Sequence, residues 1–128
     1  MTAQFSSRTS LRVSTEVLRF EVTPAGGPAT AAVDFSAGVR TQSGAEVMLS
    51  VERRSADGAG GGTDAATPIT FAGQGSGTLD GSLDSISARA VAGRWTGSGL
   101  RHGRLVFALH AGAPGAHTVP VRFVLSAP

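Results

Sequence analysis

The residues best suited to metal binding or proton transfer in this chain of 128 residues are three histidines, His102, His110 and His117. Zinc sites gather several nitrogen, sulfur or carboxylate ligands, which one strand or helix commonly supplies at short regular spacings. Here no two histidines are two or four residues apart, and the chain has no cysteine. We therefore predict partly exposed histidines near strand ends, with no metal site and no cofactor.

A serine between glycines, Ser76 in the stretch GQGSGT (73–78), comes nearest to a catalytic nucleophile. Serine hydrolases of the α/β type hold the nucleophile in a G-x-S-x-G turn between a strand and a helix. That spacing is absent here, and a phosphate-binding loop is excluded because the chain has no lysine. The stretch predicts a hairpin loop, and we expect no enzymatic activity and no catalytic residue.

Four aspartates in or beside glycine-rich loops offer another kind of site: Asp57, Asp64, Asp80 and Asp84. Calcium takes several oxygen ligands from loops of this kind. The spacing matches no EF-hand loop or calcium-binding repeat, and aspartates also stabilise turns by bonding to the nearby backbone. The sequence leaves both interpretations open.

The single tryptophan, Trp95 in GRWTGSG, is the candidate for carbohydrate binding. An exposed indole can stack on a sugar ring, and the neighbouring Arg94 could cover the same ring. Such sites usually combine two or three aromatic side chains, and this chain has no tyrosine. Because a large apolar ring also suits a sandwich core, we favour burial of Trp95 and keep Trp95 with Arg94 as the alternative ligand-binding pair.

The composition indicates neither nucleic-acid binding nor insertion into a membrane. The isoelectric point is about 11.0, but the net charge is only +2. All 11 basic residues are arginines, and only Arg53 and Arg54 are adjacent, as expected for a solvated surface. No stretch approaches the roughly 20 apolar residues of a membrane-spanning helix.

Short segments with alternating apolar residues, separated by Gly- and Pro-rich turns, follow one another along the chain. Alternation of this kind is typical of half-buried strands, and no window of a dozen residues has the apolar period of a helix. The sequence therefore predicts an all-β fold, a single Ig-like antiparallel β-sandwich of seven or eight strands. The segments lie at 3–14, 10–24 in two phases, 30–39, 45–54, 68–73, 86–95, 103–112 and 114–128, with a loop at 55–67.

Both ends of the chain are predicted to be strands, and we divide it into an N-terminal segment, 1–9, and a sandwich domain, 10–128. The apolar phase changes near residues 16–18, which indicates a bulge or a break. In the last strand Pro120 has no N–H to donate, so that strand is expected at a sheet edge or at a bulge.

Three stretches carry a resemblance to a known family. PGAHTVPVRFVLSAP (114–128) resembles the closing strand of bacterial spore-coat-protein-U-like and related fimbrial surface subunits, and RWTGSGLRHGRLVFALHAGAPG (94–115) is similar to the hairpin before it. FSSRTSLRV (5–13) resembles the donor segment that pilin-type subunits insert into the next subunit. The resemblance implies donor side chains at Phe5, Leu11 and Val13, and an acceptor groove lined by Val119, Val121, Phe123 and Leu125.

From these features we expect a bacterial structural module, secreted or at the cell surface, that self-associates or joins another surface subunit by strand addition. The stretch MTAQFSSRTS lacks the apolar core of a signal peptide, so we expect that a signal was removed from this chain. The alternative is a carbohydrate- or small-ligand-binding sandwich that uses Trp95, Arg94 and the glycine-rich loops.

Overall fold

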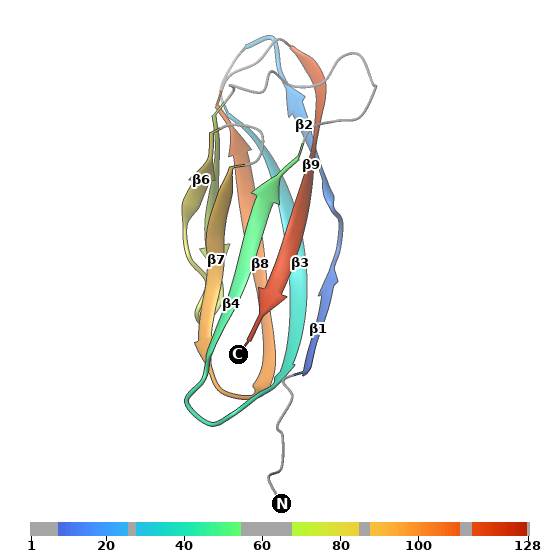
Figure 1. Cartoon of the computed structure of the whole chain (residues 1–128). Helices are drawn as coiled ribbons and strands as arrows, with labels where there is room; N and C mark the ends of the chain where they lie inside the picture. The colour runs from blue at the N-terminus through green and yellow to red at the C-terminus, as the bar shows by residue number, and fades with distance from the viewer. Residues whose placement is uncertain (1–7, 26–27, 55–67, 85–87, 111–113, 128) are drawn as a thin grey trace, which may run out of the picture.

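The computed structural model describes residues 8–25, 28–54, 68–84, 88–110 and 114–127. They form two antiparallel sheets packed face to face, so the predicted all-β sandwich is confirmed (Figure 1). Within the described ranges there are nine strands rather than seven or eight. The strands are β1 (Arg8–Val13), β2 (Val17–Val22), β3 (Ala29–Arg40), β4 (Glu46–Arg53), β5 (Ile69–Gln74), β6 (Gly81–Leu83), β7 (Arg89–Thr96), β8 (Gly99–Leu109) and β9 (Gly115–Ser126).

One sheet has five strands in the order β1-β3-β8-β5-β6, and the other has four in the order β2-β9-β4-β7. The core lies between them because alternate residues of each strand face inward. In β3, for example, Val33 and Phe35 are buried while Asp34 between them is exposed. Each large apolar side chain buried in this way stabilises the fold by roughly 1.5–3 kcal/mol.

The change of apolar phase near the N-terminus is a change of sheet. β1 pairs with β3 in the five-stranded sheet, whereas β2 pairs with β9 in the other. The link between them is bonded to both sheets: Ser14 N donates to Asp34 O, and Glu16 O accepts from Val121 N, each at 2.9 Å. A break was therefore predicted correctly, and it carries the chain across the sandwich.

The last strand, β9, is not at the edge of its sheet, which corrects our expectation for Pro120. Residues 115–120 pair with β2, and residues 121–126 pair with β4. Pro120 lies where β9 exchanges one partner for the other. Its carbonyl accepts from Arg54 N, one residue beyond the end of β4, at 2.9 Å. The N and C=O of one residue in an antiparallel strand point to the same edge, so the ring nitrogen of Pro120 also faces the place where β4 has ended. A residue without an N–H is tolerated there because β4 has already ended.

Helices are absent from the part of the chain that the structure describes, and none of it forms a helix that could cross a membrane. β8 begins at Gly99, four residues before the predicted start, and continues to Leu109. Both β1 and β9 have one end at the lower end of the sandwich in Figure 1, where the five-stranded sheet carries the groove described below.

Candidate functional site

Trp95, the candidate sugar platform, is a core residue. The residue is 7% exposed, and its ring centroid lies 5.8 Å from that of Phe35 at an interplanar angle of 58°. The indole Nε1–H donates to Ser76 O at 2.8 Å, which satisfies its one polar group. A ring without an exposed face cannot stack on a sugar, so the core alternative is confirmed and the ligand-binding one is wrong for Trp95.

The glycine-rich stretch around Ser76 makes room for this indole. A Cβ at Gly77 would collide with the Nε1 edge of Trp95, and a Cβ at Gly93 would collide with the six-membered ring. The stretch also covers the free edge of β7, because Leu79 N donates to Ala92 O and Arg94 N donates to Gly77 O, each at 2.9 Å. The glycines therefore serve the packing of the sandwich.

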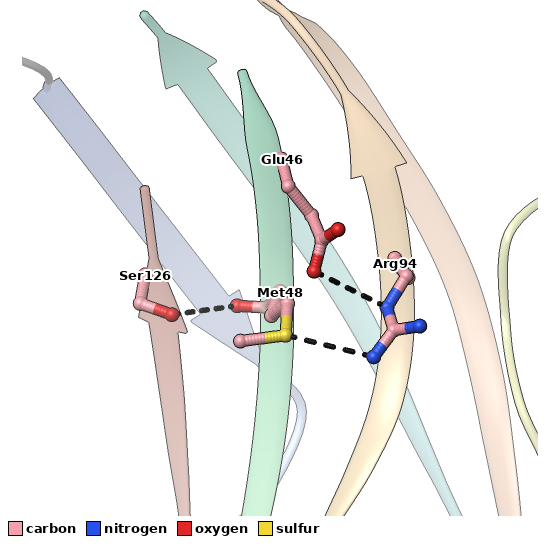
Figure 2. Close-up of polar contacts among 4 residues, drawn as sticks. All are labelled: Glu46, Met48, Arg94 and Ser126. Atoms are coloured by element: carbon pink, nitrogen blue, oxygen red, sulfur yellow. Dashed lines mark hydrogen bonds and ion pairs between the residues drawn. The ribbon is translucent and has the colours of Figure 1, made fainter. Parts of the chain in front are cut away.

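Arg94 lies on the opposite face of β7 from Trp95. Its Nε is 3.5 Å from Glu46 Oε1, and its terminal nitrogen is 3.9 Å from Met48 Sδ on the outer face of the four-stranded sheet (Figure 2). Ser126 Oγ, on the far side of β4, donates to Met48 O at 3.5 Å. Since neighbouring strand residues point to opposite faces, Arg94 does not cover the Trp95 ring, and the predicted pair does not form one site.

The histidines and aspartates of the described residues are dispersed. No group of three His, Cys, Asp or Glu side chains in these ranges lies close enough to hold a metal ion. His110 Nε2 is 2.7 Å from Thr70 Oγ1. Asp80 Oδ1 accepts from Gly73 N at 2.9 Å, so it links the start of β6 to β5 and does not form an Asx turn with this bond. Asp57 and Asp64 lie outside the described residues, where calcium binding stays untested.

The predicted donor side chains are part of this chain's own sheet. Leu11 and Val13 are half-buried and pack against the core from β1, which pairs with β3 of the same chain. Phe5 lies outside the described residues.

The predicted acceptor residues on β9 face the same core. Val119 and Val121 are buried, and their half of β9 is already covered by β2. Phe123 is also buried, whereas Leu125 is half-buried at the lower end of the strand.

The lower half of β9 keeps one open edge. β4 pairs with residues 121–126 on one side, but no described strand pairs with residues 122–126 on the other. The N–H of Val121 points to that other side, where it donates to Glu16 O. Because backbone groups alternate between the two edges of a strand, those of Phe123 and Leu125 point there too.

An open groove of about 480 Å³ lies at the lower end of the five-stranded sheet. Its lining comes from β1, β3 and β8: Arg8, Thr9, Ser10, Gly38, Val39, Arg40, Gly99 and Leu100. Ser10, Gly38 and Leu100 form one row across the three strands. Because Gly38 has no side chain, the row is hollow in the middle, and Leu100, which is 65% exposed, forms its apolar side.

Arginines provide the charge of this groove. Arg8 and Arg40 are directly opposite each other in the β1–β3 register, next to the row through Gly38. Asp34 is the one carboxylate in β1, β3 and β8, and its Oδ1 lies 2.8 Å from Arg104 Nε. That hydrogen bond raises the pKa of Arg104. The described part of the sheet therefore holds no carboxylate free to pair with Arg8 or Arg40.

None of the groove residues was predicted from the sequence. The signal available was alternation, which places Ser10 and Gly38 on the outward phase of their predicted segments, whereas Leu100 lies before the predicted segment 103–112. Their meeting depends on the pairing of β1 with β3 and of β3 with β8, which joins segments separated by up to about 90 residues. Nothing local in the sequence specifies that register.

Fold and groove together define a β-sandwich module with an open surface site. No family model matches the sequence, and no curated protein matches it. One similar solved structure is described as "CBM4 structure and function", with 14% identity and a TM-score of 0.39 over 88% of this chain and 95% of that one.

Another similar structure is a family two carbohydrate esterase from Cellvibrio japonicus, with 13% identity and a TM-score of 0.37 over 95% of this chain. This chain covers 35% of the esterase chain. At these TM-scores the likenesses do not extend beyond the general architecture that the two sheets already define. The resemblance to spore-coat and fimbrial subunits stays a prediction.

Proposed function

We propose that this chain is a non-catalytic module, secreted or at the cell surface, that binds a carbohydrate in the groove between β1, β3 and β8. The observation that carries the proposal is the hollow row Ser10–Gly38–Leu100 beside two arginines. Sugars present hydroxyl groups and apolar C–H faces together. The groove offers the matching partners: guanidinium and hydroxyl donors on one side and an exposed aliphatic side chain on the other.

The size and form of the groove support the same proposal. About 480 Å³ lies within the roughly 300–1,000 Å³ typical of small-molecule sites. The groove lies on paired strands rather than on a loop, so its walls are held in place before a ligand arrives. Preorganisation of this kind lowers the entropic cost of binding.

Filling the groove tests the proposal. In Gly38→Val the new Cβ meets only Ser10 Oγ at 2.9 Å, the end of a side chain that can rotate, and Leu100 Cδ1 at 3.7 Å. We therefore expect a folded protein whose binding to polysaccharides, measured by affinity gel electrophoresis, is lost. The matched control is Ala32→Val, an exposed outward position on the same strand outside the groove. If both variants retain binding, the site lies elsewhere.

A second candidate function is strand addition by a second copy of this chain at the open half of β9. The specific observation is the unpaired edge at Phe123 and Leu125, beside half-buried apolar residues of β1. Antiparallel pairing of two copies about Val124 would place Phe123 opposite Leu125 of the other copy. Both residues direct their backbone groups to that edge, so the hydrogen bonds match, and Arg122 would face an uncharged Ser126.

A matched pair of substitutions tests this second candidate. Leu125→Pro removes the N–H on the open edge, whereas Leu125→Ala shortens the same side chain and keeps the N–H. We expect the dimer, measured by sedimentation velocity, to be lost in the first variant and kept in the second. A wild-type protein that stays monomeric at high concentration would eliminate strand addition between copies.

A further inference from the structure

We infer that the ligand of the groove carries an anionic group, a carboxylate or a sulfate ester, which is held between Arg8 and Arg40. This inference rests on the proposed carbohydrate site and names the chemistry of its ligand. Both arginines are exposed and lie on the outward phase of their strands, in the row next to Ser10 and Gly38. An anion bound there would touch both guanidinium groups.

The register explains why an anion is favoured. Residues directly opposite in an antiparallel pair have Cβ atoms roughly 4.5–5.5 Å apart, and like charges in that position repel. Arg8 and Arg40 occupy such a pair at the end of β1. Asp34, the one carboxylate of these three strands, is bound to Arg104. A ligand carboxylate or sulfate would offset the repulsion and accept charge-assisted hydrogen bonds from both arginines.

The rest of this face argues against a nucleic acid as the ligand. Single-stranded nucleic acids bind to surfaces that combine basic groups with exposed aromatic rings for base stacking. The outward residues of β1, β3 and β8 include no Phe, Tyr or Trp side chain, since Phe35 and Phe107 both face the core, and the imidazole of His102 is the one ring exposed on these strands. A flexible hydroxylated chain with periodic negative charges needs no such rings.

Titration calorimetry with the full chain tests the inference. Polygalacturonate and its methyl-esterified form share one backbone and differ in charge, and dextran sulfate and dextran do the same for sulfate. We expect the charged member of at least one pair to bind and the uncharged member to bind about tenfold more weakly. Whichever pair responds identifies carboxylate or sulfate as the anionic group.

Substitutions locate the charge effect. Arg8→Gln and Arg40→Gln should each weaken binding of the charged polymer by about three- to fivefold, as expected for exposed ion pairs. Binding of the uncharged polymer should fall less, because glutamine keeps a hydrogen-bond donor and loses only the charge. The control Arg19→Gln removes one exposed charge from β2 in the other sheet and should have no effect.

The possible failures are distinct. Equal binding of charged and uncharged polymers overturns the inference and leaves the carbohydrate site standing, whereas binding of none overturns both. An effect of Arg19→Gln as large as that of Arg8→Gln would mean diffuse attraction and would also overturn the inference. Tighter binding of a single-stranded oligonucleotide than of any polysaccharide would replace the proposed ligand class.

Discussion

Substituting Gly77 by alanine should destabilise this protein through two separable effects. The first is backbone strain, because Gly77 has φ of +79°, a left-handed conformation that costs an L-residue about 1–2 kcal/mol. The second is the collision of the new Cβ with the indole of Trp95. Overpacking of a close-packed core costs about 1–3 kcal/mol. We therefore expect the free energy of unfolding to fall by about 2–5 kcal/mol in total.

Gly44 provides the control that separates the two effects. Its φ is +80°, but a Cβ there would have no heavy atom within 4 Å. Gly44→Ala should therefore show the backbone strain alone, about 1–2 kcal/mol. The difference between the two variants, about 1–3 kcal/mol, measures the contact with Trp95.

Urea unfolding followed by circular dichroism gives both values, and the fluorescence of Trp95, the only tryptophan, reports the local change. With an m-value of about 1–3 kcal/mol/M, the two midpoints should differ by roughly 1 M. The emission should shift to the red in Gly77→Ala and stay unchanged in Gly44→Ala. Equal midpoints with identical spectra would refute the conclusion that glycines make room for the indole.

Two further predictions concern arginines at opposite extremes of exposure. Arg53 is 2% exposed, and its guanidinium donates to Leu83 O at 3.0 Å across the sandwich. Arg53→Met should therefore lower the free energy of unfolding by about 2–3 kcal/mol. The control Arg54→Met changes an exposed neighbour and should leave the urea midpoint nearly unchanged. The hydrogen bond to Asp34 raises the pKa of Arg104. Because the pKa of this cation is higher in the folded state, the stability that the ion pair contributes is lost only when the pH rises above the pKa of Arg104. The stability difference between wild type and Asp34→Asn should therefore stay constant from about pH 6 to pH 10, and a difference that decays across this range would contradict it.

The β-strands follow from features that are local in the sequence. In β3, a 12-residue strand, the alternation of Val33, Phe35 and Val39 with polar or small residues is enough to predict a strand with one buried face. The break between β1 and β2 was visible because Leu18 is out of phase with Leu11 and Val13. A change of phase reverses the face that a strand buries, so a break was required before the chain could continue.

The surroundings of Trp95, Arg94 and Pro120 could not be predicted in this way. Trp95 and Arg94 are neighbours in the sequence, yet they point to opposite faces of β7, one into the core and one toward Glu46. Pro120 predicted an edge strand, but β9 lies between β2 and β4. The proline is tolerated there because β4 ends beside it and needs no N–H from this residue. In both cases the deciding partner comes from a distant part of the chain.

The sequence by itself determined the class of the fold, because alternation and turn residues act over a few neighbouring positions. Only the tertiary structure decided where the open surfaces are. Arg8 and Arg40 face each other because β1 pairs with β3 in one particular register, and Gly38 leaves a hollow because Ser10 and Leu100 lie on either side. Register between distant strands depends on how both sheets bury their apolar faces together, and no single segment of the chain contains that information.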